Sequence, residues 1–474
     1  MNFVGRKRQL DTLKKLWTSN RPEFLILYGR RRVGKTALLR RFLQECQSDP
    51  TVYFLGQRLS DRENLRSLGQ TLGKALNDQF LAMHGFASWQ EVFPWLEQRY
   101  QLQPWPSKLI LAFDEYPYLR ESNPGLDSIF QAGWETHLSH LPVLMILCGS
   151  QIAVMEKMMG YSSPLYGRRT AQMQLPPMTF PEIRQMFAGL SFSDVLERVA
   201  IAGGIPAYLE KLVPYSDLRQ AIREQIWQPT ELLFREGEFL LREELRKPRT
   251  YFAILRAVAN HCHKFGEIVN ETGIPRNQLT VYLHTLQDLH MLEREVSVTE
   301  KAPDRSHQAR YQYSDPFLAF WFRFVFAFQG ALELGRLQET ETALDNALPG
   351  LVSRQYERLA QELVWEHPEV FLPQRVGRWW NRQDEIDVVG INQDENAILF
   401  GEAKWTTRPV GVDVMAELHR KAGTVDWGKP DRKELFALFS KSGFTTALTR
   451  HARAEGTLLF REDQVLPSQG ASVI

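Results

Sequence analysis

At 474 residues the chain is long enough for about three domains, because single hydrophobic cores stop growing near roughly 250 to 300 residues. Apolar residues make up 43% of the chain and charged residues 24%, an ordinary globular composition that excludes a largely disordered or fibrous protein. The 57 Lys and Arg residues balance 56 Asp and Glu residues, and the net charge of +1 excludes a global attraction to nucleic acid, so such a partner would be met by local patches.

Apolar runs alternate with helical patterns in the first third of the chain. The runs are EFLILY at 23–28, TVYFL at 51–55, KLILAF at 108–113 and PVLMILC at 142–148. Strands that are apolar throughout and separated by helices are typical of a parallel sheet buried on both faces. Residues 1–178 are therefore predicted to form an α/β core.

A glycine-rich segment lies directly between the strand at 23–28 and the helical pattern ALLRRFLQE. It matches GxxxxGK[ST] and consists of Gly29, Arg30, Arg31, Arg32, Val33, Gly34, Lys35 and Thr36, with Ala37 next. In such a loop, glycines let backbone N–H groups wrap the phosphates, the lysine neutralises the β and γ oxygens, and the hydroxyl binds Mg²⁺. The pattern predicts an ATP site. A chance glycine-rich turn is the alternative, which the position between strand and helix disfavours.

Polar residues follow the next two predicted strands. Asp114 and Glu115 end one strand, where Asp114 would hold Mg²⁺ and Glu115 would polarise the attacking water. A solvated carboxylate pair at a turn is the alternative, although two adjacent buried carboxylates are costly without a cation. Ser150, after the following strand, could sense hydrolysis near the γ-phosphate.

Two arginines, Arg168 and Arg169, lie in the Gly/Pro-rich segment SPLYGRR. An arginine here suits a finger that stabilises developing charge, in cis or in trans. A plain surface pair explains the sequence equally well, since exposed arginines are common.

Helical patterns then replace the strands. Breaks at 203–206 predict a lid of short helices over residues 179–247. Residues 248–313 give three helices and a β-rich tail, which is the order of a winged helix. The tail carries basic side chains that could lie on phosphates, namely Lys301, Arg305 and Arg310.

These segments together resemble one family. FVGR at 3–6, the glycine-rich segment, LAFDE, CGSQ, SPLYGRR and GGIP resemble, in this order, the archaeal-ATPase family within the STAND branch of AAA+ proteins. The resemblance covers roughly residues 1–310 and implies that Val4, Gly5, Arg6 and Pro206 flank adenine and that Arg168 is the arginine finger. It also implies that the winged helix packs on the ATPase core and regulates it, and DNA binding is the other interpretation. A helix lead-in and an interhelical turn are the alternatives for the adenine-flanking segments.

The rest of the chain predicts a connector over 314–349 and a last domain over 350–474. The connector is rich in aromatic residues and is expected to be a packed helix followed by a linker. The last domain predicts a helix at 351–366, three strands, a helix, a strand, a helix and a final strand. This order looks like the PD-(D/E)xK core, a restriction-endonuclease-like α/β fold.

Acidic and basic residues lie where such nuclease chemistry needs them. Asp387 lies in one predicted strand, and Glu402 and Lys404 share a face of the next, because side chains alternate along a strand. Asp387 and Glu402 would bind Mg²⁺ or Mn²⁺, and Lys404 would orient or activate the hydrolytic water. By the resemblance, Glu357 on the preceding helix is a further ligand or orienter. The chain has EID in place of the motif's Pro-Asp, and a charged but inactive fold is the alternative.

These sites predict an ATP-hydrolysing protein that regulates a metal-dependent DNA nuclease, with ATP and DNA as partners and a homo-oligomer as a further assembly. The alternative is a nucleotide-dependent switch or scaffold whose last domain binds nucleic acid or protein without cutting. A third interpretation is a DNA-binding regulator that uses the winged helix, against which the near-neutral charge speaks.

No apolar stretch reaches the roughly 20 residues of a membrane span, and MNFVGRKRQLDTL lacks the apolar core of a signal peptide. We therefore expect a cytoplasmic protein without a membrane partner. Cys46, Cys148 and Cys262 are far apart and form no CxxC pair, so we expect core positions rather than a disulfide framework or a zinc site.

Overall fold

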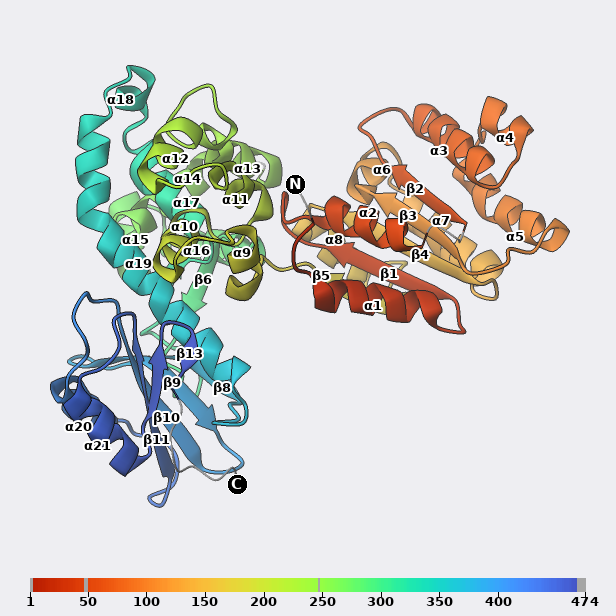
Figure 1. Cartoon of the computed structure of the whole chain (residues 1–474). Helices are drawn as coiled ribbons and strands as arrows, with labels where there is room; N and C mark the ends of the chain where they lie inside the picture. The colour runs from red at the N-terminus through yellow and green to blue at the C-terminus, as the bar shows by residue number, and fades with distance from the viewer. Residues whose placement is uncertain (1–2, 47–49, 246–247, 467–474) are drawn as a thin grey trace. The chain divides into compact units, whose positions relative to one another are not determined.

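The computed structural model describes residues 3–46, 50–245 and 248–466. The chain divides into two compact units, one of residues 1–186 with 204–207 and one of residues 187–203 with 208–474 (Figure 1). Strands β1 to β5 belong to the first unit, and all later described strands belong to the second.

A five-stranded parallel sheet forms the centre of the first unit, in the order β2-β3-β4-β1-β5. The bounds are Glu23–Tyr28 for β1, Thr51–Leu55 for β2, Leu109–Asp114 for β3, Val143–Gly149 for β4 and Ala171–Gln174 for β5. The four predicted strands are present, and β1, β3 and β4 are buried at every position, as apolar strands between helices require. The edge strand β5 was not predicted from an apolar run, because its residues AQMQ are all half-buried or exposed.

The helices of this unit are α1 Lys7–Thr18, α2 Lys35–Glu45, α3 Asp61–Ala75, α4 Gln79–His84, α5 Val92–Leu102, α6 Tyr116–Ser122, α7 Leu126–Gly133, α8 Ile152–Met159 and α9 Phe180–Met186. They pack on the sheet through a core in which the ring of Phe130 lies 5.1 Å from the rings of Phe93, Phe113 and Tyr116. Because the strands are parallel, the loops after β1, β3 and β4 meet at one edge of the sheet, where α/β proteins bind their ligands.

Helices and one hairpin make up the first half of the second unit. The helices are α10 Phe192–Ala202, α12 Leu218–Gln225, α13 Glu236–Glu244, α14 Pro248–Ala259, α15 Phe265–Thr272 and α16 Arg276–Asp288, while α11 Pro206–Leu212 begins in the first unit. Strands β6 (Leu292–Glu295) and β7 (Arg310–Tyr313) pair antiparallel. Residues 248–313 therefore have the element order that the sequence predicts.

The turn after α14 places one cysteine differently from the prediction. Cys46 and Cys148 are buried, whereas Cys262 is half-buried. His261 has φ 66° in the left-handed region, and this conformation ends the helical run and turns the chain toward α15. Cys262 therefore leaves the buried face of α14 and is not a core residue.

The second half of this unit is built on a six-stranded sheet in the order β13-β12-β11-β10-β9-β8. Its elements are β8 Arg375–Trp380, β9 Glu385–Asn392, β10 Ala397–Lys404, α20 Val412–Ala422, β11 Lys433–Ser440, α21 Thr446–Glu455, β12 Leu458–Arg461 and β13 Gln464–Val465. The pairs β8·β9, β9·β10 and β12·β13 are antiparallel, and β10·β11 and β11·β12 are parallel. The predicted strands and helices are present, and the two-residue strand β13 is an addition too short to be signalled by periodicity.

The connector differs from its prediction. Helix α17 (Pro316–Phe320) runs into a π-helical turn at Trp321–Phe326, and α18 (Gln329–Glu333) follows. The predicted linker is then helical, because α19 runs without interruption from Gln338 to Glu366 and includes Pro349. A proline inside a helix costs about 3 kcal/mol, and packing of α19 on α10 and on strands β8, β9 and β10 offsets this cost. Among the described residues, no helix is both long and apolar enough to cross a lipid bilayer.

The hairpin β6–β7 is joined to the sheet of the second half. In the loop between its strands, the N–H of Val298 donates to the carbonyl oxygen of Arg378 on β8, at 2.9 Å, and the Val298 side chain belongs to the core of that sheet. Arg310 on β7 pairs with Glu385 at 3.2 Å and lies 4.4 Å from the ring of Trp380. Arg310 is therefore not free to contact phosphates as the sequence suggested, whereas Lys301 and Arg305 are exposed.

Candidate functional site

The glycine-rich segment forms a loop between β1 and α2. Gly34 has φ 98°, and a Cβ on Gly29 would lie 2.6 Å from the carbonyl oxygen of Leu175, so neither position suits a side chain. Gly34 is the N-cap of α2, and no side chain caps it, so the first-turn N–H groups face an anion site. Lys35 is buried, and its Nζ donates to the carbonyl oxygens of Gly29 and Arg30, at 2.9 and 3.0 Å. The loop has the backbone shape and the cation of a phosphate cradle.

A carboxylate and a hydroxyl from distant parts of the chain meet beside this loop. The Oγ1 of Thr36, in the first turn of α2, donates to Oδ2 of Asp114 at the end of β3, at 2.7 Å. The hydroxyl of Tyr53 on β2 donates to the same oxygen, also at 2.7 Å. Burial and the Asp114 carboxylate raise the pKa of Tyr53 well above its usual value, so Tyr53 remains a donor. The two predicted magnesium ligands are thus adjacent, and Tyr53 is a partner that the sequence analysis did not name.

Replacing Tyr53 with Phe is expected to destabilise the first unit. The fully buried Asp114 would lose one of the donors to its Oδ2, and a lost hydrogen bond to a buried charged group costs about 1.5–3 kcal/mol. Urea unfolding of the two proteins measures the difference. Tyr100→Phe is the matched control, since the Tyr100 ring packs on Trp105. An unfolding midpoint for Tyr53→Phe no lower than that of the control contradicts the assignment.

The ends of β3 and β4 are linked by a second pair. The Oγ of Ser150 donates to Oε2 of Glu115 at 2.9 Å. Glu115 has φ 52°, a left-handed conformation that costs a non-glycine residue on the order of 1–3 kcal/mol and that clusters at functional sites. The predicted base and the predicted sensor are therefore in direct contact.

The predicted adenine-flanking residues also meet at the loop. Arg6 is 3% exposed, and its guanidinium donates to the carbonyl oxygens of Pro176 and Val33, at 2.8 and 3.0 Å. Burial lowers the pKa of Arg6, and Glu182 opposes this shift. Pro206 approaches the loop, because a Cβ on Gly34 would lie 3.8 Å from its Cγ. Of the other predicted contacts, Val4, Gly5, Arg31 and Arg32 are half-buried, and Ala37 is exposed on α2.

Arg168 lies at the opposite edge of the sheet from the loop. Thr170, two residues later, donates through its N–H to the carbonyl oxygen of Phe24 at the start of β1, at 2.9 Å. Gly29 lies five residues further along the chain, about 16 Å away at the rise of a strand. Arg168 is half-buried, pairs with Glu135 and donates to the carbonyl oxygen of Tyr166 at 2.9 Å. It therefore does not reach the ATP site of its own chain.

The residues of the predicted nuclease motif converge in the second unit. The N–H of Ala403 donates to Oδ2 of Asp387 at 3.2 Å, and Nζ of Lys404 donates to Oε1 of Glu402 at 2.6 Å. Burial and the charges of Glu402 and Glu357 raise the pKa of Asp387 to about 7. Burial opposes protonation of Lys404, but Glu402 and Asp387 outweigh it and raise the pKa of this lysine. The cluster thus combines repelling carboxylates with one ammonium group.

Glu357 reaches this cluster from α19. Burial raises its pKa, although Arg378 on β8 lies 3.6 Å from its Oε2 and opposes the shift. Gln361, one turn further along α19, donates to the carbonyl oxygen of Asp387 at 2.8 Å. Helix α19, which carries Glu357, is therefore fixed to strand β9, which carries Asp387.

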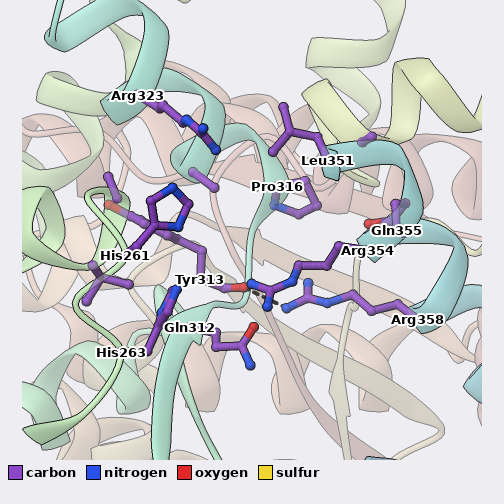
Figure 2. Close-up of a pocket in the computed structure, with 14 residues that line it drawn as sticks. His261, His263, Gln312, Tyr313, Pro316, Arg323, Leu351, Arg354, Gln355 and Arg358 are labelled. Atoms are coloured by element: carbon purple, nitrogen blue, oxygen red, sulfur yellow. Dashed lines mark hydrogen bonds between the residues drawn. The ribbon is translucent and has the colours of Figure 1, made fainter. Parts of the chain in front are cut away.

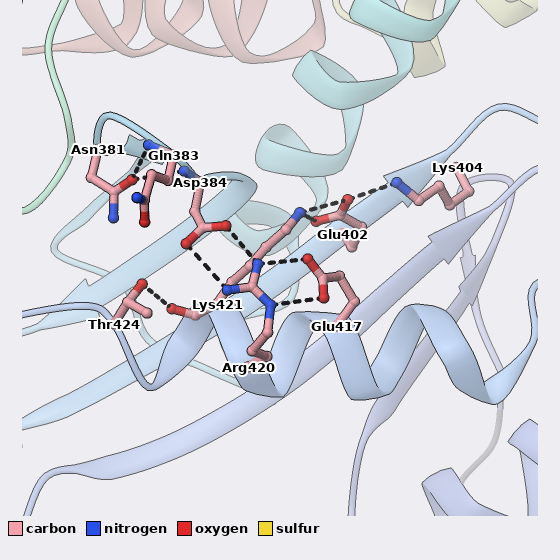
Figure 3. A network of polar contacts seen from close by, with 9 residues as sticks. All are labelled: Asn381, Gln383, Asp384, Glu402, Lys404, Glu417, Arg420, Lys421 and Thr424. Carbon is pink, nitrogen blue, oxygen red and sulfur yellow. Dashed lines mark hydrogen bonds and ion pairs between the residues drawn. The ribbon is translucent and has the colours of Figure 1, made fainter.

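A second lysine reaches the same carboxylate. Nζ of Lys421 on α20 lies 3.4 Å from both carboxylate oxygens of Glu402, as Figure 3 shows. Its neighbour Arg420 donates to Asp384 and Glu417 and so ties α20 to the turn before β9. The sequence analysis missed Lys421. The signal was its place on α20 between the buried residues Leu418 and Ala422, which aims it at the sheet.

Both candidate metal sites offer carboxylate oxygens, the kind of ligand that Mg²⁺ prefers. Within the described residues, no three His, Cys, Asp or Glu side chains are grouped so that they could hold an ion by themselves. The first site instead offers the carboxylate of Asp114, and the second offers those of Asp387 and Glu402, with the charge of Glu357 acting on Asp387. Mg²⁺ commonly binds through one or two carboxylates together with phosphate oxygens and water, so both sites fit the ion if a phosphate-bearing substrate completes the shell.

Two parts of the chain match known families. Residues 3–212 match the family described as an ATPase domain predominantly from Archaea. Residues 321–418 match a family described as archaeal and bacterial proteins of unknown function.

Three relatives extend these matches. An uncharacterized protein of Methanocaldococcus jannaschii is 32% identical over 451 residues, which cover 93% of this chain and 95% of that protein. An uncharacterized ATP-binding protein of the same organism is 52% identical over 42 residues, or 9% of this chain and 71% of that protein. The solved structure of a Walker-type ATPase of Pyrococcus abyssi has a TM-score of 0.51 and 24% identity, covers 68% of this chain and 96% of its own, and therefore has a similar fold.

Proposed function

The chain belongs to the family of predominantly archaeal ATPases, and from this premise we propose that it binds ATP with Mg²⁺ at the loop after β1 and hydrolyses it. The observation that carries the proposal is the Thr36–Asp114 hydrogen bond beside the buried Lys35, because it brings the parts of a phosphate and metal site together. When bound, Mg²⁺ neutralises charge on the β and γ phosphates.

The residues of this chain then have separate tasks. Lys35 exchanges the carbonyl oxygens of Gly29 and Arg30 for phosphate oxygens. Glu115, held by Ser150, takes the proton of the water that attacks the γ-phosphorus as the bond to the β-phosphate oxygen breaks. Arg6 and Pro206 flank the adenine. Because Arg168 does not reach its own site, it acts in trans on the site of another copy in a homo-oligomer.

Phosphate release by the full chain tests this function. Lys35→Ala is expected to lower ATPase activity at least a hundredfold, since removal of one preorganised charge-stabilising group from a catalytic site has effects of about 10² to 10³. Lys74→Ala, which removes an exposed lysine of α3, is the matched control and should keep wild-type activity. Equal rates for wild type and Lys35→Ala would overturn the proposal.

We further propose that the C-terminal sheet cleaves phosphodiester bonds in DNA with Mg²⁺ or Mn²⁺. The convergence of Glu357, Asp387, Glu402 and Lys404 favours this function, because a cation relieves the repulsion between buried carboxylates. Lys404 orients the attacking water. The ion pair with Arg378 holds the Glu357 side chain in position. The water oxygen bonds to phosphorus and gives up a proton to solvent as the bond to the leaving sugar oxygen breaks, and that leaving oxygen takes a proton from solvent.

The functional division that we propose is an ATPase core at 1–178, a lid at 179–247, a winged helix at 248–313, a connector at 314–349 and a nuclease-like domain at 350–474. Helix α19 crosses the last boundary, so the connector and the last domain share one rigid element. ATP binding regulates access of DNA to the C-terminal site. A non-cleaving switch or scaffold is the other outcome, and it is distinguished by DNA binding without cleavage under any divalent ion.

A further inference from the structure

A pocket of 100 Å³ in the second unit is lined by several basic side chains and by no carboxylate. It lies between the turn after α14, strand β7, helix α17 and helix α19. The basic side chains of its lining are His261, His263, Arg323, Arg354 and Arg358. Figure 2 shows the two arginines of α19 reaching into the pocket from one side and the two histidines from the other. The volume suffices for several water molecules or one phosphoryl group.

Arg354 is one of the two arginines of this lining whose guanidinium has no partner among the described residues. It forms no hydrogen bond and no ion pair with another described residue, and its side chain is accessible to solvent. Desolvation lowers the pKa of Arg354, repulsion from Arg378 and Arg358 lowers it further, and the charges of Glu357 and Glu295 oppose this shift. Arg358, in contrast, pairs with Glu293 and donates to the carbonyl oxygen of Tyr313 at 2.8 Å. An unpaired guanidinium beside like charges does not stabilise the fold, and it is a ready partner for an anion.

The other side of the pocket adds donors. Nδ1 of His263 lies 3.0 Å from the carbonyl oxygen of Tyr311 and must carry the proton, so Nε2 is left for a ligand. Desolvation lowers the pKa of His261, and the charges of Arg323 and Arg354 lower it further. Arg323 lies 5.4 Å from the ring of Phe324 and makes no hydrogen bond or ion pair among the described residues. Positive potential is therefore concentrated in the pocket, with two guanidinium groups uncommitted.

We propose that this pocket binds a phosphate monoester through Arg354 and Arg323, with His261 as a further donor. The dianion suits the site because guanidinium groups bind phosphate through paired N–H donors and because the lining contains no competing acid. The phosphate can belong to a nucleic-acid end or to a small phosphorylated molecule. Arg354 lies one turn of α19 before Glu357. The end of a DNA strand bound here would therefore lie next to the proposed nuclease site. This consequence rests on the proposed nuclease function.

Calorimetric titration of the full chain without divalent cations tests the proposal. The titrants are inorganic phosphate, a 5′-phosphorylated DNA oligonucleotide and the same oligonucleotide with a 5′-hydroxyl. All titrations use a Lys35→Ala background, so that the phosphate cradle of the ATPase unit does not contribute. Arg354→Gln is expected to weaken binding of the phosphate group at least about tenfold, the effect of one charge-assisted hydrogen bond. Arg336→Gln, which removes an exposed arginine of the same unit, should leave affinity within about twofold.

The results distinguish a small phosphorylated ligand from a DNA end, and failure of the pocket proposal from failure of the nuclease proposal. Binding of inorganic phosphate assigns the pocket to small phosphorylated ligands, and preference for the phosphorylated over the hydroxyl oligonucleotide assigns it to strand ends. The proposal is overturned if inorganic phosphate does not bind and the two oligonucleotides bind equally well. It is also overturned if Arg354→Gln, added to the Lys35→Ala background, leaves the affinity for the phosphate group unchanged. Without ligand, Arg354→Gln should not lower the unfolding temperature, and a clear fall would assign a structural role instead. Asp387→Ala should leave phosphate affinity unchanged, so failure of the nuclease function is distinguishable from failure of the pocket.

Discussion

Glu115→Gln is expected to retain ATP binding and to lose ATP hydrolysis, with kcat lowered by about 10² to 10⁴, the usual contribution of a general base. The amide cannot accept the proton of the attacking water. The geometry should survive, since the Ser150 hydroxyl that now donates to Glu115 at 2.9 Å can donate equally to an amide oxygen. Steady-state phosphate release gives kcat, and calorimetric titration of the same protein with ATP gives the affinity.

Glu210→Gln is the control for this change, because Glu210 is an exposed glutamate of α11. It should match wild type in both measurements. The assignment of Glu115 as base fails if Glu115→Gln hydrolyses ATP at the wild-type rate. A loss of ATP affinity in Glu115→Gln would instead identify a structural role for the Glu115–Ser150 pair.

The second large effect is expected at the C-terminal sheet. Asp387→Asn should abolish metal-dependent DNA cleavage, lowering the rate at least about a hundredfold, because an amide is a far weaker ligand for Mg²⁺ than a carboxylate. It should not destabilise the protein, since it removes the repulsion from Glu402 and Glu357 that raises the pKa of Asp387 to about 7. Loss of cleavage together with an unchanged or higher unfolding temperature distinguishes a metal ligand from a structural aspartate.

Cleavage of single-stranded and duplex DNA with Mg²⁺ and with Mn²⁺ provides the readout. Lys404→Met should show the same loss of cleavage, and Asp426→Asn, at an exposed position of the same half of the unit, should behave like wild type. Cleavage that persists in both Asp387→Asn and Lys404→Met contradicts the nuclease proposal. DNA binding without cleavage by wild type favours the switch or scaffold.

Helix α19 offers a physical route for regulation within the second unit. It packs on α10 and on strands β8, β9 and β10, and it carries both Glu357 and Arg354. The docking of the Val298 segment on β8 fixes the hairpin to the same sheet. Gln361 of α19 also donates to the carbonyl oxygen of Asp387, so α10, α19 and strand β9 are held together by one helix.

Much of the fold was predictable because its elements carry strong local signals. The fully buried strands β1, β3 and β4 are apolar at nearly every position, and the loop after β1 has a specific spacing. The edge strand β5 lacks that signal, since no apolar face is buried there. The segment before 350 was predicted as a linker, but it is helical in α19, where tertiary packing outweighs a local proline.

The candidate sites were predictable only as far as the motifs extend. Walker-type spacing identified Lys35, Thr36 and Asp114, and alternation along β10 identified Glu402 and Lys404. Tyr53 and Lys421 were missed, because each reaches its carboxylate from a neighbouring element, and strand order and helix register are tertiary information. The distance of Arg168 from the loop after β1 was likewise not predictable, because it depends on the parallel pairing of β5 with β1.

Calorimetric titration of the purified chain with ATP and Mg²⁺ tests the central claim most directly. The account predicts saturable binding to wild type and loss of at least about tenfold in affinity in Lys35→Ala, as expected when one charge-assisted contact to phosphate is removed. Absence of heat of binding in wild type, or equal affinity in Lys35→Ala, would contradict it.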